Sequence, residues 1–311
     1  MSAFSSQVIT VTCEAPINIA LTKYWGKDEQ YPLDLNVPLN DSISMTLDPG
    51  VLRTTTTITA SPSFKRHEMW LNGKEIELSQ RMVNVIRYVQ HHYVTSQGNK
   101  KNKDETPARN FRYFQIRSAN NFPTAAGLAS SASGFAALTY ALCKIHGMDK
   151  DSMGDDISAL SRVGSGSSTR SLYGGFVRWY ANINNNDKSI DESKNENNEN
   201  RVNVEDTRRN EGNSQEYEAS QNPHRSEATT GNDHKQTTKS SHASKNVNIH
   251  QLSVARQVKD EKWWPDLRVI ILVVSDQTKS VSSSKGMQIT AVNVYAPQRK
   301  EKYMRDFFKN L

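Results

Sequence analysis

Small, hydroxyl-bearing and positively charged residues gather in four short stretches of the sequence, and these residue types suit the binding of phosphate groups. Residues 121–134 read NFPTAAGLASSASG, between a strand-like alternation at 111–118 and apolar residues at helical spacing over 135–145. In the order strand, loop, helix, free backbone N–H groups and the helix dipole form an anion site at the loop. Because Ser is a common N-cap, and because neither a P-loop nor a dinucleotide fingerprint is present, an ordinary capped helix remains the alternative.

Three further stretches place lysine, arginine or serine where a predicted strand or helix ends. Residues 11–27 read VTCEAPINIALTKYWGK, an alternating strand that breaks at Pro16. Residues 161–180 read SRVGSGSSTRSLYGGFVRWY, which combines flexible backbone, hydroxyls and one guanidinium. Residues 267–290 read LRVIILVVSDQTKSVSSSKGMQIT, where the apolar run 269–274 predicts a central buried strand. Solvated lysines would explain residues 11–27 alone and a Gly/Ser linker residues 161–180 alone, but together the four stretches predict one site for several phosphates.

The composition divides the 311-residue chain into folded parts and one polar segment. Residues 184–246 contain 13 Asn, and their larger apolar residues are only Ile190, Val202, Val204 and Tyr217. Such a segment cannot bury enough apolar surface to offset chain entropy, so we expect a disordered insertion that splits a folded unit. An ordered loop of this length is the rarer alternative.

The net charge indicates which class of ligand the protein binds, and the cysteines and apolar runs indicate its location in the cell. Outside residues 184–246 the chain has 30 basic and 21 acidic residues, a net charge of +9 against +6 for the whole chain. This surplus suits a polyanion, and without a nucleic-acid motif we expect a small molecule rather than nucleic acid. Cys13 and Cys143 form no spacing motif and are expected to be buried thiols. We see no leader and no apolar run that could span a membrane, which predicts a cytoplasmic protein without membrane contact.

The motifs APINIALTKYWGK, NNFPTAAGLASSASGFAAL, GSGSSTRSLYGG and LVVSDQTKSVSSSKGMQ together resemble mevalonate diphosphate decarboxylase, a family of the galactokinase, homoserine kinase, mevalonate kinase and phosphomevalonate kinase superfamily. The resemblance implies an α/β sandwich of the ribosomal protein S5 domain 2-like type. It also implies an ATP- and Mg²⁺-dependent reaction that converts mevalonate 5-diphosphate to isopentenyl diphosphate in isoprenoid and sterol biosynthesis. On this basis we expect a split N-terminal domain at 1–183 and 247–295 and the start of a C-terminal domain at 296–311. A homodimer is left open.

The resemblance also implies roles for individual residues. It places Lys23, Ser131 and Arg170 at the reacting end, with Ser131 near Mg²⁺. The residues that it assigns to ATP are Pro123, Gly127, Leu128, Ala129, Ser130 and Ser131. The residues that it assigns to mevalonate 5-diphosphate are Asn18, Tyr24, Trp25, Gly26, Lys27, Arg81, Ser165, Gly166, Ser167, Ser168, Thr169, Arg170 and Ser284.

One motif of the family is missing from this sequence. The family's proposed base is an aspartate in an Asp-Ala-Gly-Pro-Asn-like motif of the C-terminal half, and no such motif occurs in the 311 residues. Two alternatives to the decarboxylase therefore stay open. One is a superfamily kinase that acts on a phosphorylated alcohol without decarboxylation, and the other is an inactive polyanion-binding fragment.

Overall fold

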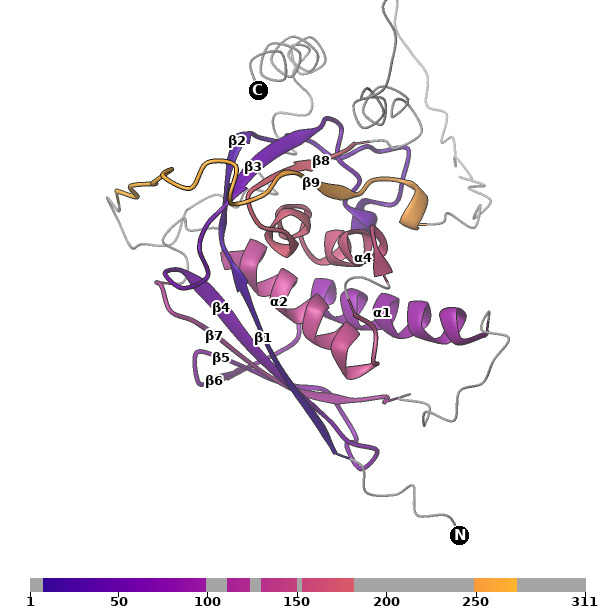
Figure 1. Cartoon of the computed structure of the whole chain (residues 1–311). Coiled ribbons are helices and arrows are strands. Elements are labelled where there is room, and N and C mark those ends of the chain that lie inside the picture. Colours follow the sequence, from indigo (N-terminus) through magenta and orange to yellow (C-terminus); the bar gives the residue numbers. More distant parts are fainter. Residues whose placement is uncertain (1–7, 99–110, 124–129, 150–152, 182–248, 273–311) are drawn as a thin grey trace, which may run out of the picture. The chain divides into compact units, whose positions relative to one another are not determined.

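A computed structural model describes residues 8–98, 111–123, 130–149, 153–181 and 249–272 (Figure 1). The chain divides into two units, 1–187 with 248–311 and 188–247, and all described residues belong to the first. Within them, two β-sheets and three α-helices form a mixed α/β fold, which confirms the predicted fold class. No helix in the described part of the chain is long and apolar enough to cross a membrane.

The larger sheet has five strands in the order β1-β4-β7-β5-β6. All neighbours in it are antiparallel except β5 and β7, which are parallel. Its strands are β1 (Ile9–Pro16), β4 (Arg53–Ala60), β7 (Phe114–Asn120), β5 (Glu68–Leu71) and β6 (Lys74–Ile76).

Strand β4 shows why this sequence forms a sheet with one buried face. Its residues RTTTTITA are mostly β-branched, and every second side chain from Thr54 to Ala60 is buried. Of the alternate threonines, Thr57 and Thr59 pair with threonines of β1, where the Oγ1 atoms of Thr12 and Thr57 lie 2.9 Å apart. The period of two therefore fixes which face of β4 meets the helices.

The turn between β5 and β6 has a local cause. Asn72 and Gly73 both have positive φ angles, 49° and 78°, and they connect Leu71 to its antiparallel partner Lys74. Two central residues with positive φ define a type I′ turn, whose twist matches that of the flanking strands. The Asn-Gly pair thus closes this hairpin.

The second sheet has four antiparallel strands in the order β2-β3-β8-β9. Strand β8 precedes residues 182–248 and β9 follows them, so the chain on both sides of that segment joins the same sheet. The bounds are β2 (Asn18–Thr22), β3 (Ser42–Thr46), β8 (Phe176–Trp179) and β9 (Ala255–Lys259).

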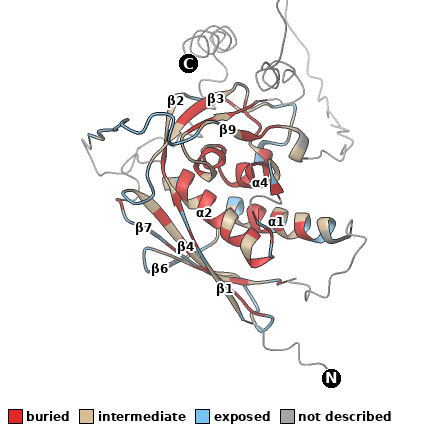
Figure 2. Ribbon diagram, viewed as in Figure 1, coloured by how far each residue is buried: buried red, intermediate tan, exposed pale blue. Residues whose placement is uncertain are grey.

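Three α-helices pack between the two sheets (Figure 1): α1 (Gln80–Gly98), α2 (Ser130–Ile145) and α4 (Asp156–Gly164). Helix α2 packs on β1 and β4, and most of its side chains are buried (Figure 2). It ends before Gly147, whose φ of 74° is the left-handed conformation that commonly stops a helix. The predicted helix after the small-residue loop is therefore confirmed. Cys13 and Cys143 are buried free thiols, also as predicted.

Three short 3₁₀ helices complete the described part of the chain: η1 (Leu33–Leu35), η2 (Gly166–Leu172) and η5 (Ile249–Gln251). The fully buried Arg162 of α4 joins two of them. Its Nε donates a hydrogen bond to the carbonyl of Leu35 at 3.0 Å, and its two terminal nitrogens donate to the carbonyls of Ile249 and Ser253. Burial lowers the pKa of Arg162 to about 10, so the guanidinium stays charged at neutral pH. Three backbone carbonyls thereby solvate a cation that water cannot reach.

The predicted strand over 269–274 is wrong for the residues that the structure describes. Residues 269–272 have no regular secondary structure, and Ile270 and Leu272 are 86% and 84% exposed. A strand is stable only when a neighbour accepts and donates its backbone hydrogen bonds, and no described strand lies beside this segment. Residues 273 and 274 lie outside the described part of the chain.

His67 predicts a pH dependence of stability. Its Nδ1 accepts a hydrogen bond from the backbone N–H of Phe114 at 3.2 Å, which requires that nitrogen to be unprotonated. Burial lowers the pKa of His67 below its ordinary value of 6.5. As the pH drops below 6.5, His67 therefore becomes protonated in the unfolded chain before it does in the folded chain. The free energy of unfolding should fall over this range. Urea unfolding between pH 7.5 and 5 measures this fall.

The matched comparison is His67→Gln against His91→Gln, because His91 is exposed on α1. His67→Gln should flatten the loss of stability at acidic pH relative to the unsubstituted chain, and His91→Gln should leave it unchanged. Identical pH profiles for all three proteins would contradict the role of His67.

Candidate functional site

The buried guanidinium of Arg170 lies at the centre of the predicted site. It comes from η2, and its Nε and one terminal nitrogen donate hydrogen bonds to the hydroxyls of Ser44 and Ser42 on β3, at 2.8 and 2.9 Å. The guanidinium carbon lies 5.8 Å from the ring centre of Tyr24 and 5.6 Å from that of Trp179. Burial lowers the pKa of Arg170 to about 10, and Tyr24 partly offsets this. The charge is thus fixed in place and retained at neutral pH.

Asn18 and Gly166 hold the η2 segment against the second sheet. The Asn18 side-chain amide donates hydrogen bonds to the carbonyl of Ser167 at 3.0 Å and to the hydroxyl of Ser171 at 2.7 Å. A side chain at position 166 would place its Cβ 2.5 Å from the Trp179 ring and 3.1 Å from the Tyr24 ring. Glycine therefore lets the backbone of η2 approach these two rings closely.

Ser165 connects η2 to the start of α2. Its hydroxyl lies 3.5 Å from that of Ser131, at the limit of a hydrogen bond, and 3.1 Å from that of Ser167. Ser131 is exposed in the first turn of α2, where backbone N–H groups lack helical partners. The structure thus brings the predicted ATP-binding serine and the predicted diphosphate-binding loop side by side.

Lys27 and Arg81 add positive charge near Tyr24. Burial lowers the pKa of Lys27, the positive charge of Arg81 lowers it further, and Asp34 opposes both. Burial raises the pKa of Tyr24, and the charges of Arg170 and Arg81 pull it back. Arg81 also lies over the Phe135 ring of α2, 5.4 Å from its centre. The electrostatic coupling of these four residues agrees with one shared site.

No carboxylate in the described residues forms an ion pair with Lys23, Lys27, Arg81 or Arg170. Three arginines elsewhere in the fold provide a contrast, since Arg53, Arg178 and Arg256 each lie within 2.9 Å of a carboxylate oxygen. Cations that gather without acidic partners repel one another unless an anion binds between them. The cluster therefore favours a polyanionic ligand.

Asn40 fixes the backbone of the predicted substrate segment 23–27. Its side chain accepts a hydrogen bond from the N–H of Trp25 at 3.0 Å and donates one to the carbonyl of Lys23 at 3.2 Å. Lys23 and Trp25 are exposed, and Gly26 has a φ of 105° that favours glycine. Asn40 therefore presents the Lys23 side chain to solvent from a fixed backbone.

Two residues of the predicted loop direct their hydroxyls into the protein. The Ser168 hydroxyl has one hydrogen and lies within hydrogen-bond distance of the carbonyls of Ser161 and Ser165, and Thr169 donates to the carbonyl of Gly166 at 2.8 Å. Both side chains are fully buried. In this conformation they stabilise η2 and present no side chain to a ligand.

The remaining predicted residues divide between described and undescribed parts of the chain. Pro123 is exposed after β7, and Ser130 begins α2. Gly127, Leu128, Ala129 and Ser284 lie outside the described residues, as do residues 184–246 and 296–311.

A pocket of about 180 Å³ lies between the first turns of α2 and the larger sheet. Apolar side chains, among them Met69, Ile116 and Leu138, form most of its wall, and Ser130 and Ser131 also line it. Such a cavity suits a flat, largely apolar group attached to a polar one at the helix start.

Sequence reasoning missed the residues that support the charged ones. Ser42, Ser44 and Asn40 lie in SISM and LND, which carry no motif, and Trp179 looks like an ordinary strand residue. Their contacts with Arg170 and with segment 23–27 depend on how β3 and β8 pair. The only signal in the sequence is that Ser42 and Ser44 occupy alternate positions, as residues on one face of a strand do.

Comparisons with known proteins show which family the chain resembles. Residues 15–191 match the diphosphomevalonate decarboxylase-like N-terminal domain. Diphosphomevalonate decarboxylases of Homo sapiens and Saccharomyces cerevisiae are each 34% identical to this chain, over 92% and 91% of it and 54% of their own lengths. The chain thus spans about half the length of the curated relatives that it matches.

Solved structures show the same relationship. A mevalonate 5-diphosphate decarboxylase is 32% identical, with a TM-score of 0.64 over 96% of this chain and 59% of the other. Mevalonate diphosphate decarboxylase from Trypanosoma brucei is 28% identical, with a TM-score of 0.62 over 97% of this chain and 59% of the other. From the matched domain, these identities and these folds, the chain belongs to the diphosphomevalonate decarboxylase family.

Proposed function

We propose that this protein takes part in the ATP-dependent decarboxylation of mevalonate 5-diphosphate. ATP phosphorylates the tertiary hydroxyl, and the phosphate then leaves as the carboxylate carbon departs as carbon dioxide. The products are isopentenyl diphosphate, ADP, phosphate and carbon dioxide. The observation that carries the proposal is the fixed Arg170 cation, beside Tyr24 and without an acidic partner in the described residues. The product is an isoprenoid and sterol precursor, and we expect a cytoplasmic enzyme.

The cation cluster would hold the substrate at its two charged ends. The diphosphate would lie between Arg81, Lys27 and the backbone of η2, where charge-assisted hydrogen bonds are strongest. Arg170 would also face the substrate carboxylate, because Ser42 and Ser44 leave part of its guanidinium for a ligand. Ser284 would complete the diphosphate site. Substrate placement of this kind supplies most of the catalysis in phosphoryl transfer.

The start of α2 would hold the phosphates of ATP. Its free N–H groups and helix dipole favour an anion, and Ser131 lies 3.5 Å from Ser165 of the substrate loop. The apolar pocket beside Ser130 and Ser131 would take the adenine base. Mg²⁺ bound to the phosphates, with Ser131 nearby, would neutralise charge in the transition state, and the exposed Lys23 would approach the transferred phosphate.

Turnover by the 311-residue chain tests the proposal. Purified protein incubated with ATP, Mg²⁺ and mevalonate 5-diphosphate should release ADP and carbon dioxide in equal amounts, because each carboxylate lost requires one phosphoryl transfer. A coupled ADP assay and trapping of labelled carbon dioxide measure both products.

Other outcomes distinguish the alternatives. ADP without carbon dioxide, from mevalonate 5-phosphate, would indicate a kinase. Binding of mevalonate 5-diphosphate without any turnover would indicate a binding protein. A protein that does not bind mevalonate 5-diphosphate and does not turn it over would contradict the proposal itself.

Substitution of Arg170 tests the placement of the substrate. Arg170→Ala should weaken mevalonate 5-diphosphate binding by about 2 kcal/mol or more, because it removes charge-assisted hydrogen bonds. Isothermal titration calorimetry measures the change. Arg117→Ala is the matched control, since Arg117 is an exposed arginine of β7 that stacks on Trp70.

A second variant guards against misfolding, because Arg170 is buried. Ser44→Ala leaves the cation in place but removes the hydroxyl that orients it, so affinity should fall by a smaller amount. Unchanged affinity in both folded variants would refute this placement of the substrate.

A further inference from the structure

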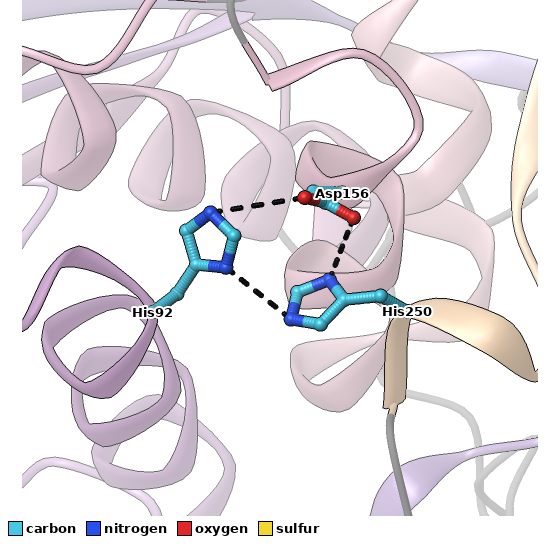
Figure 3. Close-up of side chains that lie close together, drawn as sticks. All are labelled: His92, Asp156 and His250. Carbon is cyan, nitrogen blue, oxygen red and sulfur yellow. Dashed lines mark hydrogen bonds and ion pairs between the residues drawn. The ribbon is translucent and has the colours of Figure 1, made fainter. Parts of the chain in front are cut away.

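Two imidazoles and a carboxylate converge on one point outside the proposed active site. His92 lies on α1, Asp156 begins α4, and His250 lies on η5 (Figure 3). One ligand atom from each can be chosen so that all three lie within 4.8 Å of one another. Residues from three separate elements therefore meet although 64 and 94 positions separate them along the sequence.

The contacts within this triangle leave one nitrogen, His92 Nε2, without a hydrogen to donate. His92 Nδ1 lies 3.3 Å from His250 Nε2, and His250 Nδ1 lies 2.9 Å from Asp156 Oδ1. Two neutral imidazoles have one N–H each, which suffices for these two contacts. The third contact, 3.8 Å between His92 Nε2 and Asp156 Oδ2, then brings two lone pairs together. A positive centre beside His92 Nε2 and Asp156 Oδ2 would satisfy these two lone pairs.

The set of donor atoms identifies the class of cation. Imidazole nitrogen suits Zn²⁺ and neighbouring transition metals, whereas Mg²⁺ prefers oxygen ligands. Tetrahedral Zn²⁺ with bonds of about 2.0–2.1 Å separates its ligand atoms by roughly 3.3 Å. Since one ligand atom from each of the three residues can be chosen within 4.8 Å of the others, small rotations of the side chains would bring them to that separation. The side chains of His92, His250 and Asp156 are 16%, 23% and 38% exposed, so water can reach a fourth position.

We propose that His92, Asp156 and His250 form a binding site for a transition-metal dication of the Zn²⁺ class. The nearby cation Arg256 forms its ion pair with Asp155, at 2.9 Å. The carboxylate of Asp156 therefore stays available to a metal. The metal joins η5, directly after residues 182–248, to α1 and α4. Its role is structural, since it holds the returning chain beside the two helices. The site is distinct from the magnesium expected at Ser131.

Zinc titration of the full chain, without an affinity tag and after treatment with EDTA, tests this site. Calorimetry should give one Zn²⁺ per chain, and excess Mg²⁺ should not displace it. Each of His92→Gln, Asp156→Asn and His250→Gln should weaken zinc binding more than about tenfold, because loss even of a residue that only orients a ligand costs 10- to 100-fold. Zinc should also raise the melting temperature of the unsubstituted chain but not of these variants.

Two controls separate this site from other histidines of the chain. His91→Gln changes the exposed neighbour of His92 and should leave zinc affinity unchanged. Simultaneous replacement of His224, His234 and His242, which lie in the 184–246 segment, should also leave it unchanged. Circular dichroism confirms that each variant is folded. The proposal would be overturned if the unsubstituted chain did not bind zinc, or if the three ligand variants bound zinc as tightly as the unsubstituted chain. The three side chains would then form only a hydrogen-bonded triangle.

Discussion

The architecture of the site depends on one buried guanidinium. A cation removed from water is costly unless hydrogen bonds and polarisable groups replace its hydration, and Arg170 has two serine hydroxyls and two aromatic rings for this purpose. These partners come from β3, from β8 and from the segment after β2. The second sheet must therefore be paired before the charge can be held, and η2 must lie against it. The glycine at position 166 is part of the same constraint.

Local sequence patterns predicted much of the fold because their causes are local. The end of β1 at Pro16 and the helix that follows the small-residue loop both follow from residue type and period. The predicted strand over 269–274 could not be judged in this way, because an apolar run becomes a strand only if a partner strand is available. The exposed Ile270 and Leu272 show the result for the described residues.

The charged residues of the site were predictable from the sequence, but the residues that hold them in position were not. The motifs indicated Lys23, Lys27 and Arg170, since positive charge after a strand is visible in sequence. The serines that orient Arg170 lie 126 and 128 positions from it, and only strand pairing brings them together. The same holds for His92, Asp156 and His250, whose spacing matches no metal motif. Long-range contacts between single, common residues leave no pattern that a sequence can show.

The hydrogen bonds of Arg162 affect which parts of the protein unfold together. Its three acceptors come from two distant parts of the chain, Leu35 on one side and residues 249–253 on the other. If the latter segment detached alone, a fully buried cation would lose two of its three acceptors, at a cost well above that of ordinary fraying. The segment should therefore exchange its amide hydrogens together with α4, as one cooperative unit rather than as a loose end.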